Sequence, residues 1–240
     1  MGAAAVREAV DIARAHDLPV GLHLTLVDGR PVLPRERVPD LVDARGSFRL
    51  GLVGPAVRLA LSPRARRQTQ AECEAQIEAF MATGLELDHV NAHHHFHLHP
   101  LVLALVVDLA RRYRAPAVRL PLERGVPPYR SAVLGAVMLP WTSRARRRLR
   151  KAGVVTNDAL FGLYDSGAMT EAAWLRIVPR IAAGVTEVYC HPTTSMTAPR
   201  QRGAPSPADE LAALLSPRVR AALDSAGIRR MSFAAAAHEA

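Results

Sequence analysis

The feature that most constrains the fold is an alternation of short apolar segments with longer segments of helical periodicity. Strand-like segments recur along the chain, at residues 20–26, 87–92, 117–120, 186–190 and 228–233. Helical patterns lie between most of them, which favours an α/β domain with a mostly parallel sheet, either open or closed into a barrel. In such folds the chemistry gathers where strands end.

Helix signals support this pattern. Ser62 followed by Pro63 is typical of a helix start, and the apolar spacing continues to about residue 83, before Gly84. Further helices are predicted at residues 4–15, 100–113, 143–152 and 170–178, with two short helices meeting at Ser216 and Pro217. The intervening residues 30–62 and 124–145 are predicted to be mostly irregular.

Length and composition suit one globular domain spanning residues 1–240. Hydrophobic residues make up 49% of the 240 residues, which is enough for a full core. No segment approaches the roughly 20 consecutive apolar residues of a membrane helix, and the charged N-terminal segment is unlike a signal peptide. Two distant cysteines, Cys73 and Cys190, argue against a disulfide framework, so we expect a cytoplasmic protein.

The net charge of +9 comes almost entirely from arginine, since Lys151 is the only lysine among 31 basic residues. Neither a zinc finger nor an aromatic RNA-binding motif accompanies the charge, so we expect no nucleic-acid partner. The densest basic run covers residues 144–151. It is either a solvated helix face or a contact for anionic lipid headgroups.

Histidines occur where predicted strands end. His23 alternates with Leu22 and Leu24, so it faces away from them, and His191 follows an apolar strand and precedes Pro192. Taken alone, each is as compatible with a structural role as with a functional one.

Residues 89–99 hold six histidines in eleven positions. In extended backbone, alternate residues of this run would share one face, namely His93, His95, His97 and His99. Imidazole is the commonest protein ligand for divalent metals, so the run predicts a metal site. The alternative is a polar loop that is merely rich in histidine.

Other polar residues are candidates for supporting roles. Arg119 and Glu123 flank the end of the predicted strand at 117–120 and are candidates for binding substrate, or else form a surface ion pair or cap. Glu72 and Gln76, one helical turn apart, are candidates for orienting the site. The sequence lacks the motifs of serine hydrolases, P-loop proteins and dinucleotide-binding enzymes.

Several segments, in this order, resemble the YdjC-like carbohydrate deacetylases: GLHLTLVDGRPVLP, AECEAQIEAF, LDHVNAHHHFHLHP, VRLPLE and EVYCHP. The resemblance spans about residues 4–195. The His-rich segment, FGLYDSGAMT and GVTEVYCHP are most similar to the branch associated with hopanoid biosynthesis, called HpnK.

This resemblance implies a distorted (β/α) barrel of the polysaccharide-deacetylase type and one divalent metal ion, magnesium or zinc. The implied protein ligands are His23, His93 and an Asp from an N-terminal acidic pair. His191 is implied as the proton donor or a substrate contact, and His95 and His97 as residues behind the ligands or lining the substrate. The family's first strand and acidic pair precede the GLHL segment and have no counterpart here, so we expect the barrel without its first strand.

The implied reaction is hydrolysis of an N-acetylated sugar to acetate and a free amino sugar. The branch implies an N-acetylglucosaminyl group on a hopanoid glycolipid, with the protein cytoplasmic or peripheral to the inner membrane, and relatives are often homodimers. One rival is a non-catalytic metal- or sugar-binding remnant of such an enzyme. Another is a different metal hydrolase, such as a phosphoesterase, although that class usually uses more carboxylates.

Overall fold

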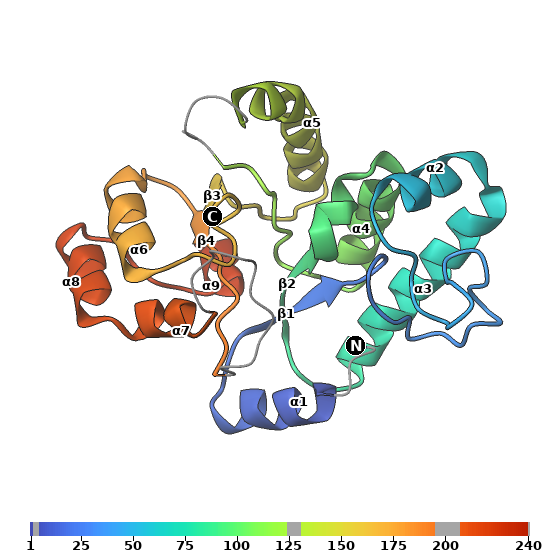
Figure 1. The fold of residues 1–240 in the computed structure, drawn as a ribbon, viewed down its shortest axis with the longest axis horizontal. Coiled ribbons are helices and arrows are strands. Elements are labelled where there is room, and N and C mark those ends of the chain that lie inside the picture. The colour runs from blue at the N-terminus through green and yellow to red at the C-terminus, as the bar shows by residue number, and fades with distance from the viewer. Residues whose placement is uncertain (2–4, 124–130, 195–206, 240) are drawn as a thin grey trace. The chain divides into compact units, whose positions relative to one another are not determined.

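The computed structural model describes residues 1, 5–123, 131–194 and 207–239, with the backbone alone for residues 131–139 and 207 (Figure 1). The chain forms two compact units. The first comprises Met1–Arg119, Ser143–Thr156 and Ser232–Ala240, and the second comprises Leu120–Thr142 and Asn157–Met231. Each unit is described by itself, so the prediction that residues 1–240 form a single domain stays a prediction.

The first unit is built on parallel strands whose order follows the chain. Strand β1 (Val20–Leu24) pairs with β2 (Leu87–Ala92), with His23 opposite Asn91. Single parallel bridges extend this arrangement from Val90 to Val118 and from Ala117 to Val155. Leu22 and Leu24 are buried, whereas His23 between them is exposed, as the alternation predicted.

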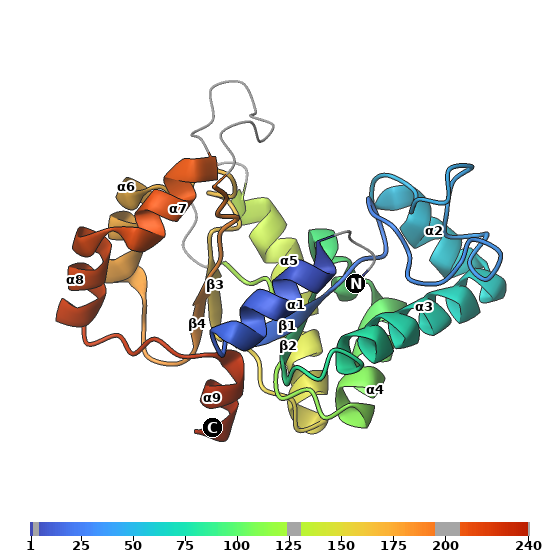
Figure 2. The same ribbon diagram turned by 90° about the horizontal axis from the view of Figure 1, so that it is seen from below.

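Helices complete the first unit: α1 (Val6–Ala15), α2 (Val53–Leu61), α3 (Pro63–Met81), the 3₁₀ segment η1 (His93–Leu98), α4 (Pro100–Arg112), the C-terminal part of α5 (Ser131–Lys151) and α9 (Phe233–His238). Helices α3 and α4 pack beside each other (Figure 2). The predicted start of α3 is confirmed, because Ser62 Oγ accepts a hydrogen bond from Ala65 N at 3.1 Å.

Helix α3 anchors the loop that follows His23. The buried Glu72 carboxylate accepts hydrogen bonds from Val32 N (2.8 Å) and Leu33 N (3.0 Å). Gln76 bonds both backbone groups of Thr25 and also donates to Glu72 at 2.8 Å. Burial raises the pKa of Glu72, and the donated hydrogen bonds act against this rise. Gln76 therefore holds the backbone two residues after His23, and Glu72 holds the loop further along the chain.

The second unit contains the parallel pair β3 (Ala159–Phe161) and β4 (Thr186–Val188). Its helical elements are α6 (Glu171–Ile177), η2 (Val178–Arg180), α7 (Pro207–Leu215) and α8 (Pro217–Ser225). Apolar side chains from these elements form one core, including Phe161, Met169, Trp174, Ile177 and Leu223. The predicted junction of two helices at Ser216 is confirmed.

Some local predictions were wrong. Residues 228–232 form no strand, and α9 begins at Phe233 because Ser232 caps it by accepting from Ala235 N. Helix α2 lies in the segment predicted to be loop, and α5 begins at Ser131, well before the predicted residue 143. The parallel α/β class is confirmed, whereas closure into a barrel stays a prediction. No helix in the described part of the chain is long and apolar enough to cross a bilayer.

Candidate active site

The first unit brings the two histidines expected to bind metal into direct proximity. His23 stands at the end of β1, and His93 is the first residue after β2. His23 Nε2 lies 3.3 Å from His93 Nδ1, and the rings meet edge to face with centroids 5.5 Å apart. Two nitrogens that bind one zinc ion at about 2.0–2.1 Å in tetrahedral geometry are roughly 3.4 Å apart. The pair therefore fits a shared divalent cation.

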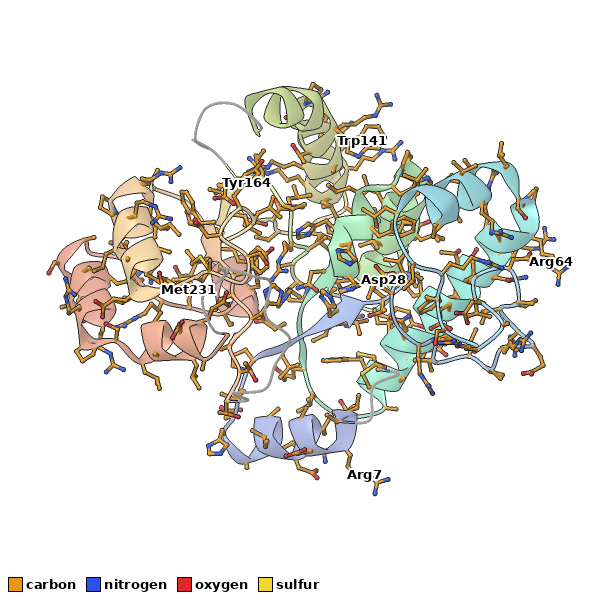
Figure 3. The ribbon with its side chains drawn as sticks, viewed as in Figure 1. Arg7, Asp28, Arg64, Trp141, Tyr164 and Met231 are labelled. Carbon is orange, nitrogen blue, oxygen red and sulfur yellow. The ribbon has the colours of Figure 1, made fainter. Side chains whose placement is uncertain are left out.

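The His-rich segment turns instead of running extended. His94 (φ 49°) and His95 (φ 55°) adopt the left-handed conformation within η1, so the prediction that alternate histidines share one face was wrong. The turn leaves His94 exposed, and its Nε2 lies 3.1 Å from Oδ2 of Asp28. Asp28, in the loop after β1, is labelled in Figure 3. It also buries His97 completely.

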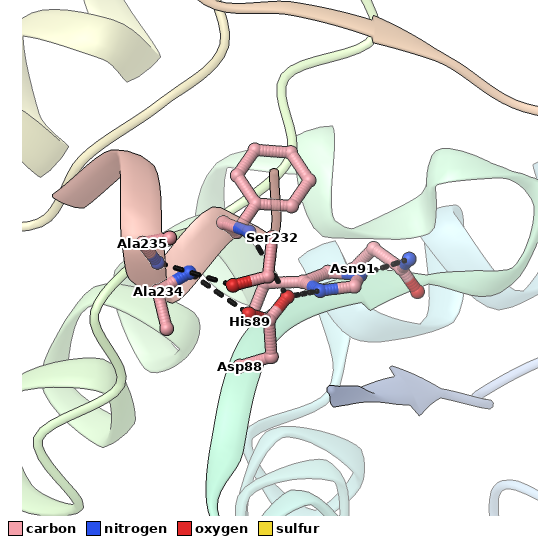
Figure 4. Close-up of polar contacts among 7 residues, drawn as sticks. Asp88, His89, Asn91, Ser232, Ala234 and Ala235 are labelled. Atoms are coloured by element: carbon pink, nitrogen blue, oxygen red, sulfur yellow. Dashed lines mark hydrogen bonds and ion pairs between the residues drawn. The ribbon is translucent and has the colours of Figure 1, made fainter. Parts of the chain in front are cut away.

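Asp88, His89 and Asn91 form a chain of polar side chains along β2 (Figure 4), and its Asn91 end reaches His23. The Asn91 amide lies 2.5 Å from His23 Nδ1 and 3.1 Å from His89 Nε2. His89 Nδ1 in turn lies 2.9 Å from Asp88 Oδ2. The Asp88 carboxylate also accepts hydrogen bonds from the first turn of α9, at Phe233 N and Ala234 N. Those contacts hold Asp88 in place at the far end of the chain.

One of the two orientations of the Asn91 amide satisfies its neighbours better, because the orientation with the amide oxygen towards His23 places the amide nitrogen beside the Arg119 guanidinium, which is also a donor. In one, its oxygen accepts from His23 Nδ1 and its nitrogen donates to His89 Nε2. In the other, its nitrogen donates to His23 Nδ1, and its oxygen accepts from His89 and from the Arg119 guanidinium at 3.2 Å. The orientation decides which His23 nitrogen carries the proton in the neutral ring.

Strand β1 approaches this polar chain closely. A Cβ on Gly21 would lie 2.4 Å from Cε1 of His89, so only glycine allows the strand to pass the imidazole. Sequence reasoning did not select Asp88, His89 or Asn91. The GLHL segment carried a usable signal, a glycine inside a strand, which often marks the close approach of another group.

His95 and His97 do not behave as equivalent residues. His97 Nε2 donates to the Arg119 carbonyl at 2.9 Å, and the side chain is fully buried. This favours the supporting role for His97, behind the site, while its assignment as a residue lining the substrate stays a prediction. Burial lowers the pKa of His97 to about 3. Burial, followed by the charge of Arg119, lowers the pKa of His95 to about 4.

The unfolding free energy is expected to fall as the pH drops from 6.5 towards 4. An unfolded histidine binds a proton below about pH 6.5, whereas folded His97 stays neutral until about pH 3. Its stabilising contribution is complete above pH 6.5 and declines by about 1.4 kcal/mol per pH unit below it. Urea unfolding at several pH values would measure this slope, and His97→Gln should reduce it by about one proton. An unchanged slope in the variant would assign the acid sensitivity to other groups.

The other two predicted site residues, Glu123 and His191, belong to the second unit. Glu123 Oε2 accepts hydrogen bonds from Leu163 N (2.9 Å) and Tyr164 N (3.2 Å), so it fixes the loop after β3. Burial raises the pKa of Glu123. Glu123 therefore has a structural role, while its assignment as a substrate contact stays a prediction.

His191 follows β4, and its side chain is exposed. Its Nδ1 lies 3.5 Å from Ser166 Oγ, and its ring meets Tyr189 edge to face at 5.3 Å. The completely buried Glu210 of α7 accepts hydrogen bonds from His191 N (2.5 Å) and Met169 N (3.2 Å). Glu210 therefore positions the backbone of His191. No sequence pattern indicated this role of Glu210, because an acidic residue in the first turn of a helix is ordinary.

Comparison with known proteins identifies relatives of this arrangement. The family model described as YdjC-like protein matches residues 1–225. Proteins named carbohydrate deacetylase from Brevibacillus brevis and Geobacillus stearothermophilus are 31% and 30% identical, over 77% and 95% of this chain. The human protein of that name is 31% identical over 79% of this chain. These alignments cover 64%, 81% and 63% of the respective relatives, so this chain spans less than two thirds of the first and the last.

A solved structure shares the fold. It is the "putative cellobiose-phosphate cleavage protein" of Enterococcus faecalis V583, with a TM-score of 0.72 and 26% identity, covering 95% of this chain and 82% of that one. The family match over most of the chain and the relatives above 30% identity agree with it. The chain therefore belongs to the YdjC-like protein family.

Proposed function

We propose that this chain is a metal-dependent carbohydrate deacetylase, which hydrolyses the N-acetyl group of a sugar. The observation that carries the proposal is the 3.3 Å approach of His23 Nε2 to His93 Nδ1 at the ends of two paired parallel strands. Strand ends are where such folds place their chemistry. Relatives at about 30% identity that are named carbohydrate deacetylases support the choice of reaction.

One divalent ion would be held by His23 and His93. Nitrogen ligands favour zinc over magnesium, which prefers oxygen ligands and keeps several waters. Bound there, such an ion supplies a water of lowered pKa and polarises the acetamide carbonyl.

The orientation of the Asn91 amide decides whether the Nε2 lone pair of His23 is available to a cation. When His23 Nδ1–H donates to the Asn91 oxygen, the Nε2 lone pair is available. Asn91 then donates to His89 Nε2, and His89 Nδ1–H donates to the Asp88 carboxylate. In this orientation each residue donates a hydrogen bond to the next, from His23 through Asn91 and His89 to the Asp88 carboxylate. Metal-binding histidines usually donate their second ring N–H to such an acceptor. The opposite amide orientation, favoured by Arg119, puts the proton of neutral His23 on Nε2 and blocks binding.

The second proposed catalytic group is His191. Water adds to the acetamide carbon and gives up a proton to a base. The C–N bond breaks as the imidazolium of His191 gives its proton to the leaving amine, and the acetic acid formed ionises to acetate. The products are acetate and an amino sugar. Glu210 supports this assignment, because it accepts a hydrogen bond from His191 N and so holds the backbone from which the imidazole extends.

As the substrate, we propose the N-acetylglucosaminyl group of a hopanoid glycolipid. The basis is the similarity of the His-rich segment, FGLYDSGAMT and GVTEVYCHP to the HpnK branch. Helix α5 supports this choice. It buries Ala145 and Leu149 and exposes a basic face of Arg144, Arg147, Arg148, Arg150 and Lys151, which suits a surface of anionic lipid headgroups. A protein peripheral to the cytoplasmic membrane, acting as a homodimer, fits this proposal.

The proposal is tested with His93→Ala, which removes one of the two imidazoles. We expect bound zinc, measured by elemental analysis, to fall from near one per chain to background. Acetate release should fall with it, from both N-acetylglucosamine and an N-acetylglucosaminyl glycolipid. His16→Ala is the matched control, because His16 is exposed at the end of α1.

Unchanged metal content in His93→Ala would remove His93 from the ligand set and defeat the proposal. Metal binding by the wild-type chain without acetate release from either compound would indicate a binding protein instead of an enzyme. Release from the soluble sugar alone would reject the glycolipid as the substrate and keep the reaction.

A further inference from the structure

Asp28 and His94 form a second pair of potential ligands beside His93. Asp28 Oδ2 lies 3.1 Å from His94 Nε2, and each of Asp28, His93 and His94 offers a ligand atom within 4.8 Å of those of the other two. Within the described part of the chain, no other three His, Cys, Asp or Glu side chains converge this closely. A separation near 3 Å is also what two ligands of one ion show at metal–ligand distances of about 2.0–2.2 Å.

The backbone holds this pair in a costly conformation. Asp28 (φ 52°) and His94 (φ 49°) both lie in the left-handed region, and His95 (φ 55°) is next to them. Five described non-glycine residues have positive φ, and three of them are here. Strained backbone of this kind concentrates at functional sites, where the surrounding structure maintains it.

Only one carboxylate oxygen of Asp28, Oδ2, faces His94. Its Oδ1 accepts a hydrogen bond from Gly51 N at 3.1 Å, which fixes the carboxylate and leaves Oδ2 facing His94. The Asp28 side chain is 23% exposed and His94 is 51% exposed, so an ion could reach them from solvent. A plain ion pair between exposed groups would be worth little and would not account for the strained turn on both sides of it.

We propose that Asp28 and His94 bind the same divalent ion as His93, with Asp28 as its carboxylate ligand. The inference rests on the proposed function, which places a divalent ion at His93. The close group consists of Asp28, His93 and His94, and His23 is not a member of it. A site with imidazoles and one carboxylate resembles the donor sets of catalytic zinc sites, and the carboxylate offsets the charge of the cation. The ligand class is a divalent transition metal, of which zinc is the probe.

The test is zinc binding to the full chain after removal of metal with a chelator, measured by calorimetry. Asp28→Asn retains an oxygen for Gly51 N, and asparagine tolerates positive φ at both positions, so Asp28→Asn and His94→Asn should keep the fold. Each should weaken zinc binding by about 100-fold, at least as much as loss of a group that only supports a ligand. The visible spectrum of the cobalt-substituted chain should change in both variants.

Matched controls are available. Asp17→Asn replaces another aspartate of positive φ (49°) that is exposed, and His16→Asn replaces an exposed histidine of the same unit. Both should bind zinc as the wild type does. Wild-type zinc affinity in either Asp28→Asn or His94→Asn, with an unchanged cobalt spectrum, overturns the inference.

His23→Asn separates this inference from the proposed function. If His23→Asn loses zinc while Asp28→Asn and His94→Asn retain it, the inference fails and the proposed function stands. If the Asp28 and His94 variants lose zinc and His23→Asn does not, the inference stands and the ligand pair of the proposed function is wrong. A wild-type chain that takes up no zinc overturns both.

Discussion

His191→Ala is expected to lower kcat for deacetylation by about 10²–10⁴-fold, the usual contribution of a general acid. The leaving group is an amine, which is expelled poorly unless it receives a proton as the C–N bond breaks. The substitution should leave the fold intact, because Glu210 bonds the backbone N–H of residue 191 and not its side chain. Steady-state kinetics with an N-acetylated sugar would measure the effect.

The division between kcat and KM identifies the role of His191. Loss of a proton donor lowers kcat and leaves KM nearly unchanged, whereas loss of a substrate contact raises KM. A raised KM with wild-type kcat would therefore reassign His191 to substrate binding. His238→Ala is a suitable control, because His238 is an exposed residue near the end of α9.

The sequence predicted the part of the site that depends on strand register. His23 lies on a strand with clear alternation, and His93 comes directly after another strand, so pairing of β1 with β2 brings them together. The α/β class followed from the same alternation. These predictions held because they depend on local periodicity and on the rule that paired parallel strands end at the same edge.

The remaining contacts depend on backbone conformations that periodicity cannot reveal. The left-handed turn at His94 and His95 separates the roles of neighbouring histidines and brings His94 to Asp28. Glu210 reaches His191 from a helix 19 positions further along the chain, and Asp88 meets residues 145 and 146 positions away. Such contacts arise only once the chain is folded. The strand expected at 228–233 was wrong, and at its C-terminal end the reason is local, because Ser232 caps α9, which begins at Phe233.

Gly162→Ala is expected to destabilise the second unit by about 3–5 kcal/mol, a loss large enough to require a named cause. Gly162 follows β3 with φ 96°, and a Cβ there would lie 2.2 Å from the carbonyl oxygen of Tyr189. That oxygen is backbone, so relief requires β3 and the chain after β4 to separate. Tyr189 N donates to Phe161 O at 3.0 Å, and this bond would be strained first.

Tryptophan fluorescence during urea unfolding is the natural measurement, because Trp141 and Trp174, the two tryptophans of the chain, both belong to the second unit. Gly167→Ala separates conformation from contact. Gly167 has a similar φ of 82°, but a Cβ there would meet nothing within 4 Å. It should therefore cost only the backbone strain, about 1–2 kcal/mol. Equal losses in the two variants would show that the approach of Gly162 to Tyr189 adds nothing. A larger loss at Gly162 would show that the chain leading to His191 depends on this close contact.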